Sequence, residues 1–356
     1  MLNVFLILPI LVIGFANCSK STVNSVVPIA NSLPDFSKLS PSCFALQNST
    51  PILPLNSQFS GAEWNDPHVL KVGSDFVMYA SADTNFTKNI KIYRMISQDG
   101  KNWSLSPTAA VFQKSASAGA WDSQSVETPA VIFFHGQFYM FYTGYTDQTN
   151  SATYKVGYAT SPDGIAWTRQ STYWEPENPG GAPDLNFMQY VVGEPAPVVF
   201  NDKIYLYFAA QGAHMSVMST LFTIGLTTSG DGASWSAPQM VLVPDQAIYP
   251  RSSYIGYSTP HAQVLNNQIH LFFDVALDPF KQTKIHHAVS SDGVGTWKLD
   301  VSAIFDKSQV PWADDQINGP AVFLDGKKLF LWFGGQGNLS AFPNINMGMS
   351  LATCEL

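Results

Sequence analysis

Runs of apolar residues recur in pairs along the chain, and a proline opens each of five such pairs. In every repeat the second run begins nine residues after the proline, and successive prolines stand 62, 66, 65 and 60 residues apart. Turn residues such as His135-Gly136 and Asp325-Gly326 separate the two runs, which predicts a two-stranded hairpin in each repeat. A period of this length is typical of a ring or an array of similar units. The opening prolines are Pro67, Pro129, Pro195, Pro260 and Pro320.

Two further strands complete each predicted repeat. A third apolar run follows the hairpin, and in four repeats it leads into an Asp-Gly turn and then a tryptophan, at residues 97–103, 161–167, 229–235 and 290–297. Asp-Gly supplies a tight turn and the tryptophan can pack on the hairpin, so these aspartates are interpreted as structural. Four antiparallel strands in each of five repeats predict an all-β fold, a five-bladed β-propeller with four-stranded blades. The opening proline suits the innermost strand, which is a sheet edge.

The N-terminal part of the predicted domain is expected to close the ring. The fifth repeat has a third strand near residues 347–353 but no Asp-Gly-Trp hairpin before Leu356. The segment after Cys43 would supply the missing fourth strand and bring Cys43 beside Cys354. A disulfide there would lock the closure and stabilise the fold by roughly 3–5 kcal/mol in the chain-entropy model. Two unpaired buried thiols are the alternative.

The composition agrees with a large β-rich core and excludes one class of partner. Of the 356 residues, 46% are hydrophobic, 13% aromatic and only 12% charged. The formal net charge is −8 and the chain has three arginines, whereas binding to nucleic acid needs a basic surface. We therefore expect no nucleic-acid partner, and we expect a monomer.

The first residues resemble an export signal. Residues 1–16 form a short apolar stretch that ends in small residues, which is typical of a secretory signal peptide. Residues 17–42, rich in Ser, Pro and Asn, are predicted to be a disordered leader, and residues 43–356 a single propeller domain. No other segment is long and apolar enough to span a membrane. We expect a secreted, extracellular or periplasmic protein, with lipid anchoring through Cys18 as the alternative.

Three carboxylates stand next to the opening prolines. The inner strands of a propeller begin around one mouth of its channel, so the residues before the prolines are expected to converge there. Asp66 and Glu194 directly precede the prolines of the first and third repeats, and Glu127 lies two residues before that of the second. Carboxylates crowded at one mouth repel one another and lose hydration, which shifts their pKa values apart. Cleavage of a glycosidic bond needs two such groups, one to protonate the leaving oxygen and one to activate water or attack carbon.

The chain resembles the five-bladed glycoside hydrolase superfamily, which includes family 43 (arabinanases, arabinofuranosidases, xylosidases) and family 32 (invertases, fructanases). The resemblance covers about residues 60–354, through WNDPHVLKVGSDFVMYAS, WDSQSVETPAVIFFHGQFYMFYTGY, VGEPAPVVFNDKIYLYFA and the SPDGIAW-type hairpins. It implies that Asp66 is the general base of an inverting enzyme, or the nucleophile of a retaining one, and that Glu194 is the general acid. The residue that raises the pKa of the acid is normally an aspartate before the second proline, where this chain has Thr128.

Two departures from the family pattern leave alternatives open. Glu127 is the residue that we assign to the third carboxylate position, and Asp122 is the alternative. The third repeat reads GEPAP rather than the EGP common in family 43. Both departures bear on the family assignment and on whether the site is active.

Eight residues near the predicted mouth are expected to contact the sugar. The tryptophans can stack on a sugar ring, and in family 43 a histidine near the channel helps hold a calcium or chloride ion or water. Each of these residues also has a structural alternative, burial for the rings and an ion pair for the arginine. No cofactor is expected to be required and no metal ligands are assigned, although a structural calcium ion in the channel is a further expectation. The residues are Asn65, His68, Trp121, Asp122, His261, Arg251, Trp312 and Asn318.

The leading hypothesis is a secreted glycosidase that binds a carbohydrate substrate and acts on arabinan- or xylan-type chains with inversion. Asp66 would activate water, Glu194 would protonate the leaving group and Glu127 would tune the acid. A non-catalytic carbohydrate-binding propeller is the second hypothesis, and a retaining, family 32-like fructosidase is the third.

Overall fold

The computed structural model consists of β-strands and three short 3-10 helices in the part of the chain that it describes. The signal peptide predicted for residues 1–16 and the anchor considered at Cys18 lie outside that part. No helix among the described residues is long and apolar enough to cross a membrane. The described residues are 34–53, 62–84, 89–178, 186–214, 219–337 and 347–356. The helices are η1 (Phe36–Lys38), η2 (Ser151–Thr153) and η3 (Lys307–Gln309).

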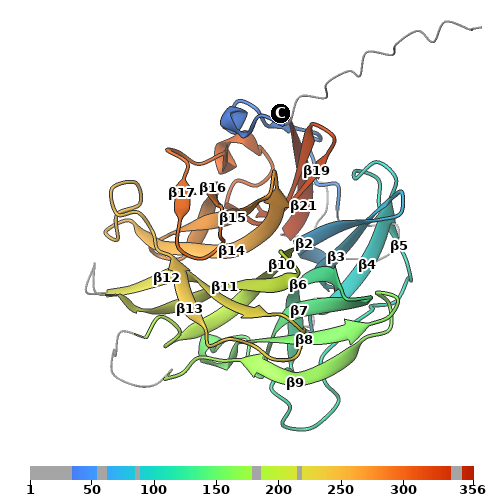
Figure 1. Ribbon diagram of the computed structural model, residues 1–356. Coiled ribbons are helices and arrows are strands. Elements are labelled where there is room, and N and C mark those ends of the chain that lie inside the picture. The colour runs from blue at the N-terminus through green and yellow to red at the C-terminus, as the bar shows by residue number, and fades with distance from the viewer. Residues whose placement is uncertain (1–33, 54–61, 85–88, 179–185, 215–218, 338–346) are drawn as a thin grey trace, which may run out of the picture. The chain divides into compact units, whose positions relative to one another are not determined.

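The strands fall into five antiparallel units, numbered here in chain order (Figure 1). Unit one contains β2 (Glu63–Val72), β3 (Asp75–Asp83), β4 (Lys91–Ser97) and β5 (Ser104–Leu105). Unit two contains β6 (Ser125–Phe134), β7 (Gln137–Tyr145), β8 (Lys155–Ser161) and β9 (Thr168–Trp174). Unit three contains β10 (Val191–Phe200), β11 (Lys203–His214), β12 (Ser219–Ser229) and β13 (Gln239–Leu242). Unit four contains β14 (Tyr254–Leu265), β15 (Gln268–Leu277), β16 (Lys281–Ser290), β17 (Trp297–Leu299) and β18 (Phe305–Asp306). Unit five contains β19 (Gln316–Asp325), β20 (Lys328–Gln336), β21 (Met347–Glu355) and, from the N-terminal end, β1 (Ala45–Leu46).

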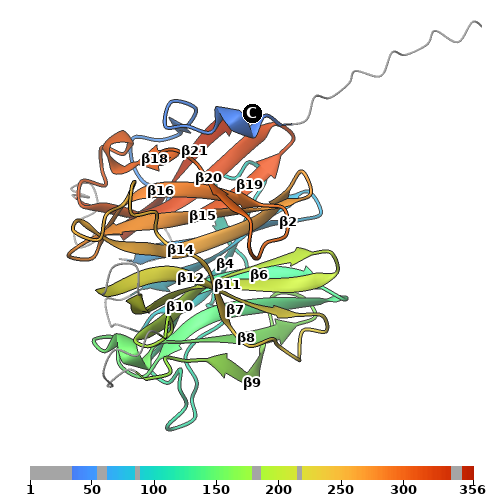
Figure 2. The ribbon, with the colours of Figure 1, turned by 60° about the vertical axis from the view of Figure 1, so that its left-hand side comes forward.

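Hydrogen bonding joins the strands of each unit in sequence order, as Figure 2 shows for β14, β15 and β16. Units one, two and five are separate four-stranded sheets, whereas units three and four form one sheet of nine strands. The link between them is a single parallel bridge from Phe222 to Gly256. The hairpin turns at Asn201-Asp202 and Asn266-Asn267 have positive φ at both residues, as a two-residue turn that matches strand twist requires.

The first strands of the five units contact one another in cyclic order. β2 contacts β6, β6 contacts β10, β10 contacts β14, β14 contacts β19, and β19 contacts β2. Figure 1 shows β2, β6 and β10 near the middle of the molecule. The residues that open these strands therefore come together although about 60 residues of chain separate each from the next.

The N-terminal segment completes unit five. Ala45 and Leu46 pair with Thr353 and Ala352 of β21, which gives unit five its fourth strand at the place that the sequence predicts. A disulfide joins Cys43 to Cys354, with the Cα atoms 5.1 Å apart. The two ends of the folded chain are thus connected by strand pairing and by a covalent bond.

The four Asp-Gly turns share one hydrogen-bond pattern, shown here for unit two. Asp163 Oδ1 accepts the backbone N–H groups of Ile165 and Ala166 at 2.8 and 2.9 Å. The Ser161 hydroxyl contacts the same carboxylate at 2.9 Å and accepts the N–H of Gly164 at 2.9 Å. The other three turns place a Ser and an Asp in the same way, at Ser97 and Asp99, Ser229 and Asp231, and Ser290 and Asp292. These contacts agree with the prediction that the turn aspartates have a structural role.

At three junctions between units, a turn also accepts a hydrogen bond from the preceding unit. The hydroxyl groups of Tyr79 in unit one and Tyr207 in unit three donate to the carbonyl groups of Gly164 and Gly293, at 2.6 and 2.7 Å. The indole N–H of Trp332 in unit five donates to the Gly100 carbonyl of unit one at 2.7 Å. Aromatic second-strand residues therefore hold neighbouring units together, and they do so between unit five and unit one as well.

The expectation of a disordered leader up to residue 42 needs correction. Phe36 and Leu39 pack against the core of unit five, and the Asn266 amide donates to the carbonyl of Pro34 at 3.5 Å. Residues 34–42 therefore belong to the folded part, because their apolar side chains find a complementary core surface.

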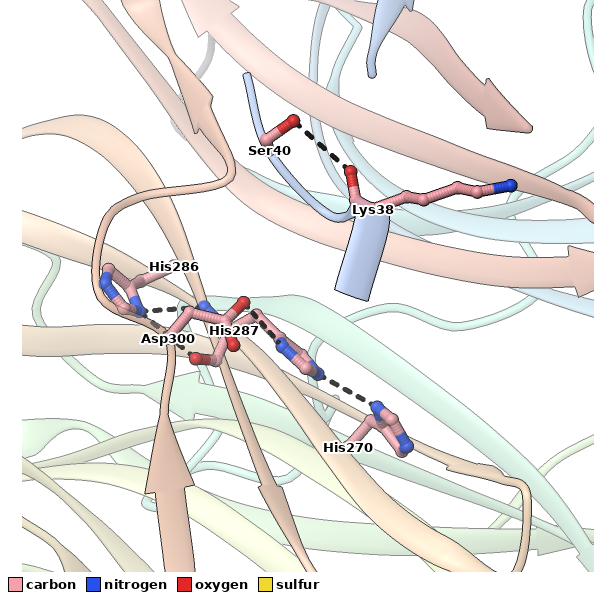
Figure 3. A network of polar contacts seen from close by, with 6 residues as sticks. All are labelled: Lys38, Ser40, His270, His286, His287 and Asp300. Carbon is pink, nitrogen blue, oxygen red and sulfur yellow. Dashed lines mark hydrogen bonds and ion pairs between the residues drawn. The ribbon is translucent and has the colours of Figure 1, made fainter. Parts of the chain in front are cut away.

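Beneath η1 lies a chain of buried histidines, drawn in Figure 3. Asp300 Oδ2 is 2.9 Å from His287 Nδ1, and His287 Nε2 is 2.9 Å from His270 Nδ1. The Phe36 ring covers His270, at a centroid separation of 4.7 Å. Burial lowers the pKa of His270 to about 3, so this ring is neutral, and the network packs as a polar part of the core of unit four.

Candidate active site

Every first strand carries a bulge at the residue that precedes its proline. The ladder between the first and second strands shifts register at this residue in all five units. The backbone there is left-handed, with φ of 53° at Asp66, 51° at Thr128, 56° at Glu194, 44° at Thr259 and 60° at Gly319. For a residue other than glycine this conformation costs about 1–2 kcal/mol. Four strained residues at equivalent places mark this ring as a functional surface, since bulges redirect side chains.

Five aligned residues of the second strands face these bulges. Each pairs in the ladder with the residue two before a proline, as Ser81 pairs with Asn65 and Thr143 with Glu127. In three units the side-chain oxygen accepts the N–H of the residue before the next unit's proline. Ser81 Oγ, Thr143 Oγ1 and Asp274 Oδ2 accept from Thr128, Glu194 and Gly319, at 2.9, 2.8 and 2.9 Å. The aligned set is Ser81, Thr143, Ala209, Asp274 and Gly334.

Unit three differs, and the difference positions Glu194. Its aligned residue is Ala209, which has no side-chain acceptor for the N–H of Thr259. Glu194 takes that place, because its Oε2 accepts the Thr259 N–H at 2.6 Å. The Glu194 carboxylate is therefore oriented by the backbone of unit four, while its own N–H is held by Thr143 of unit two.

Two cavities open beside these carboxylates. The polar cavity has a volume of about 400 Å³ and contains Asp66, whereas the apolar cavity, of about 390 Å³, contains Glu194. Glu127 lines both, and its Oε2 accepts the hydroxyl proton of Tyr145 at 3.2 Å. The polar cavity is also lined by Glu63, Asn65, Ser81, Ala82, Asp83, Ile90, Gln148, Thr149 and Met347. The apolar cavity is also lined by Thr143, Ser151, Tyr154, Val191, Gly193, Ala209, Gln211, Phe222, Ile255 and Phe280.

Burial is the main cause of the shifted pKa values in this cluster. It raises the pKa of Glu194 to about 7, and repulsion from Asp66 adds to the shift. The pKa of Asp66 is also raised by burial, although hydrogen bonds from Ser81 and Thr128 oppose the rise. The pKa of Glu127 is raised by burial and by the charges of Asp66 and Glu194. A group that is protonated near neutral pH beside one that ionises more readily is the arrangement that acid-base catalysis needs.

Asp274 is a fourth buried carboxylate that sequence reasoning missed. It is fully buried, and burial together with the charges of Glu194 and Asp66 raises its pKa well above the usual range. Its Oδ2 accepts from Gly319 N–H at 2.9 Å and from the Gln282 amide at 3.1 Å. The signal that could have found it is its alignment with Ser81 and Thr143, because only the second strand of unit four has a carboxylate there.

A small central cavity of about 30 Å³ lies among the five prolines and is too small for a sugar. His68 and His261 line it, with their ring centroids 5.3 Å apart. Each ring is fixed by a backbone carbonyl, His68 Nε2 at 2.9 Å from Val131 O and His261 Nε2 at 3.0 Å from Val322 O. Burial lowers the pKa of His68 to about 4 and that of His261 to about 3, so both are neutral. A contact with the sugar stays a prediction for both residues.

Asn65 and Asn318, two further predicted contacts, meet over Gly334. A Cβ atom on Gly334 would lie 1.8 Å from Asn65 Oδ1 and 2.5 Å from Asn318 Oδ1, so only glycine leaves room for both amides. Asn65 lines the polar cavity, and Asn318 is buried beside it.

Four other predicted residues lie away from the walls of the two cavities. Asp122 is buried and pairs with Arg169 at 2.7 Å, which leaves Glu127 as the third carboxylate of the cluster. Trp121 stacks on Tyr142 and lines a separate hollow. Trp312 belongs to the core of unit five. Arg251 donates to the Thr220 carbonyl at 2.9 Å and pairs with Asp278 at 2.5 Å, which is the structural ion pair weighed as its alternative.

No lysine, arginine or histidine of the described residues lines the polar or the apolar cavity. All three arginines are described, and each is engaged elsewhere, Arg94 with the Ser106 carbonyl at 2.7 Å and the other two as above. Among the described residues no group of three or more His, Cys, Asp or Glu side chains is arranged to hold a metal ion. The expected calcium ion stays a prediction.

The all-β fold brings carboxylates together where its first strands meet, and paired carboxylates are the groups that cleavage of a glycosidic bond needs. Residues 68–286, more than half of the chain, match the family described as β-1,4-mannooligosaccharide phosphorylase, glycoside hydrolase family 130. The chain belongs to this family. The resemblance to family 43 therefore holds for the wider superfamily and not for that family itself. No curated protein is significantly similar to the chain.

Solved structures of propeller-type glycosidases share the fold at low sequence identity. An α-L-arabinofuranosidase from Lactobacillus brevis is 12% identical, with a TM-score of 0.62 over 86% of this chain and 92% of that one. An endo-arabinase from Bacteroides thetaiotaomicron is 15% identical, with a TM-score of 0.55 over 86% and 96%. A family 117 glycoside hydrolase from Zobellia galactanivorans is 13% identical, with a TM-score of 0.58 over 88% and 89%. At these identities the similarity establishes the fold alone.

Proposed function

We propose that this protein is an inverting glycoside hydrolase in which water, not phosphate, attacks the sugar. The observation that carries the proposal is the placement of the carboxylates, with Asp66 in the polar cavity, Glu194 in the apolar cavity and Glu127 between them. Two carboxylates that open into separate cavities leave room for a water molecule on one face of the sugar and a leaving group on the other.

The roles of the three residues follow from their surroundings. Glu194, with its pKa raised to about 7, keeps a proton near neutral pH and donates it to the glycosidic oxygen as the C–O bond breaks. Asp66 ionises more readily, because Ser81 and Thr128 donate hydrogen bonds to its carboxylate, and it accepts a proton from the attacking water. Burial and the charges of Asp66 and Glu194 raise the pKa of Glu127 to about 8, so Glu127 is mostly protonated near neutral pH and adds negative charge to the cluster only as the pH rises.

The charges of the site favour water over phosphate. A phosphorylase must bind phosphate, a dianion near neutral pH, and such sites use arginine, lysine or a metal ion. The walls of the two cavities carry carboxylates and, in the described residues, no cationic side chain. Repulsion by the charge of Asp66 would oppose the binding of phosphate, and Glu194 and Glu127 would add to it as they ionise at higher pH, whereas water is unaffected.

We infer that the sugar released by hydrolysis is a mannosyl unit, which is therefore the first class of substrate to test. The family match over residues 68–286 favours a β-1,4-mannoside, whereas the arabinan-cleaving neighbours are related by fold alone. Arabinan- and xylan-type chains, which the sequence resemblance implies, are therefore the second class to test.

Phosphate dependence tests the proposal. Purified protein is incubated with β-1,4-mannobiose and mannotriose, and with arabino- and xylo-oligosaccharides, in buffers with and without 10 millimolar phosphate (about the level at which a phosphorylase is saturated). We expect reducing sugar at equal rates in both buffers and no sugar 1-phosphate by ³¹P NMR. A rate that requires phosphate, with sugar 1-phosphate as product, would contradict hydrolysis and support the activity in the family's description.

A carbohydrate-binding protein without activity is the second candidate function. Thr128 favours it, because this residue stands before the proline of unit two where the resemblance implies an aspartate. This candidate would be supported if calorimetry shows that an oligosaccharide binds, while no product forms over days with or without phosphate.

We further propose that the five units form a five-bladed propeller closed by β1 and that the protein is exported. The cyclic contacts of the first strands and the pairing of β1 with β21 support the closure. The disulfide between Cys43 and Cys354 supports export, because such bonds persist in oxidising compartments.

A further inference from the structure

The two cavities that meet at Glu127 have nearly the same volume, but the cavity at Glu194 has a more apolar lining than the cavity at Asp66. Around Asp66 the wall presents carboxylate, amide and hydroxyl groups from Glu63, Asn65, Asp83 and Gln148. Around Glu194 most of the wall is hydrocarbon. In a glycosidase these two sides hold different parts of the substrate, so the contrast bears on which substrate fits.

The apolar wall is built where units three and four join. Phe222 of β12 pairs with Gly256 of β14, and a Cβ atom on Gly256 would lie only 2.1 Å from the Phe222 carbonyl oxygen. The absent side chain lets the two strands approach and sets Ile255 beside Phe222. The Phe280 ring lies 5.4 Å from that of Phe222, and 48% of Phe280 is exposed.

The polar side chains that line the apolar cavity are Glu127, Thr143, Ser151, Tyr154, Glu194 and Gln211. The Tyr154 hydroxyl already donates to the Gln148 carbonyl at 3.1 Å. The Thr143 hydroxyl is already used by the N–H of Glu194 and by Thr128 Oγ1, at 2.8 and 2.6 Å. A sugar bound here would place several hydroxyl groups against Val191, Ile255 and the two phenylalanines. Hydroxyl groups that lose water without gaining partners cost free energy, whereas an apolar group would gain by burial.

We propose that the apolar cavity binds an apolar aglycone, so that the substrates are glycosides of alkyl or aryl alcohols rather than sugar chains extended on the leaving-group side. This inference rests on the proposed function, with Glu194 on the side of the leaving group. The Glu194 proton passes to the glycosidic oxygen, the bond from that oxygen to the anomeric carbon breaks, and a water oxygen bonds to that carbon. Asp66 takes a proton from the water, and the products are a free sugar and an alcohol.

Matched alkyl glycosides test the inference without a change in leaving-group acidity. Methyl and hexyl β-D-mannopyranosides, and the corresponding α-L-arabinofuranosides and β-D-xylopyranosides, are compared by kcat/KM, with β-1,4-mannobiose as the sugar-aglycone reference. We expect the hexyl glycoside of the accepted sugar to exceed the methyl glycoside at least about tenfold, because its chain is buried in the cavity. We also expect it to exceed mannobiose.

Two variants connect this preference to the cavity. Phe280→Ser should lower the ratio of hexyl to methyl glycoside to about threefold or less, because the mouth of the cavity loses its ring. Phe133→Ser is the matched control, since Phe133 is 55% exposed and does not line either cavity. We expect the control to keep the wild-type ratio.

The outcomes separate this inference from the proposed function. Equal kcat/KM for hexyl and methyl glycosides, or faster cleavage of mannobiose, overturns the apolar aglycone and leaves hydrolysis standing. If the wild type cleaves none of the glycosides, hydrolysis fails, and calorimetry of the same methyl and hexyl pairs decides the inference. If a hexyl glycoside binds more tightly than its methyl partner and Phe280→Ser loses this difference, the apolar aglycone is supported. If hexyl and methyl glycosides bind equally, or neither binds, the apolar aglycone is overturned.

Discussion

Carboxylates occupy two places in the repeat and meet opposite surroundings there. Those in the ring around the first strands are half-buried or, for Asp274, fully buried, and loss of hydration raises their pKa values. Those in the Asp-Gly turns are exposed, and backbone N–H groups that donate to them lower their pKa values. The first group is Asp66, Glu127, Glu194 and Asp274, and the second is Asp99, Asp163, Asp231 and Asp292.

The contrast shows that position in the repeat does not by itself decide whether a carboxyl group is ionised. The turn aspartates recur at one position in four units, and Asp66 and Glu194 stand at equivalent positions before the prolines of units one and three. Hydration and hydrogen-bond donors decide the outcome, since Asp163 receives two backbone N–H groups in water whereas Glu194 receives one inside the protein. The first is locked as an anion that shapes a turn, and the second keeps a proton that it can donate.

The largest expected effect is on activity. Asp66→Asn and Glu194→Gln should each lower kcat/KM about 10³-fold or more, because each removes an acid or base while keeping the shape of the side chain. Asp163→Asn, the same change in a turn, should stay within about twofold of the wild type. Steady-state rates on the best substrate of the oligosaccharide panel check this, and near-normal rates in Asp66→Asn or Glu194→Gln would contradict the assigned roles.

A smaller effect is expected on stability, with opposite signs for the two groups. The folded pKa of Glu194, about 7, lies above its unfolded value near 4.5, so the folded state binds this proton more tightly and stability falls as pH rises between these values. Glu194→Gln should therefore raise the free energy of unfolding at pH 8 by about 1–3 kcal/mol, and change it little at pH 4.

The turn aspartate Asp292 should behave in the reverse manner. Its folded pKa is lowered, so its contribution is present above the unfolded value near 4 and is lost as pH falls below it. Asp292→Ala should lower the free energy of unfolding at pH 8 and have less effect at pH 3. Urea unfolding of the wild type and both variants at these pH values measures the signs, and the same sign for both variants at pH 8 would refute the comparison.

The smallest expected effect is a shift in the pKa of Glu194 within the ring. Glu194 accepts the Thr259 N–H because Ala209 has no acceptor, and this hydrogen bond opposes the rise of its pKa. Ala209→Ser should offer a hydroxyl in its place, as Ser81 does in unit one, and raise the pKa of Glu194. The alkaline limb of kcat/KM, expected near pH 7, should move up by less than about one pH unit. Ala213→Ser, on the same strand, should leave the limb in place.

Sequence reasoning reached the repeat and most of its parts. The prolines, the hairpin turns and the Asp-Gly-Trp signature predicted the strands, and the position of Cys43 predicted the pairing of β1 with β21 and the disulfide. Local residue types suffice for such features, because turns and strand edges are specified by backbone geometry. The register set by each proline marked Asp66 and Glu194 directly, whereas in unit two it marks Thr128, and Glu127 was chosen as the neighbouring acid with Asp122 as the alternative.

The tertiary structure was needed for residues outside that register. Asp274 sits on a second strand and enters the ring only because β14 and β15 pair as they do. Trp121, Trp312 and Arg251 are predicted contacts for the sugar, and the structure shows their packing and ion-pair partners, while a contact with the sugar stays a prediction. Their partners are distant in the chain, so no local pattern could reveal them.

By itself, the sequence determined the repeat, the ring of residues before the prolines and the three carboxylates in it, because period and turn chemistry are local properties. Only the tertiary structure decided what those carboxylates can do. Burial raised their pKa values, the absence of an acceptor at Ala209 tied Glu194 to Thr259, and the approach of Phe222 to Gly256 built the apolar wall. Each of these depends on which strands become neighbours, and that is settled by packing of the whole ring.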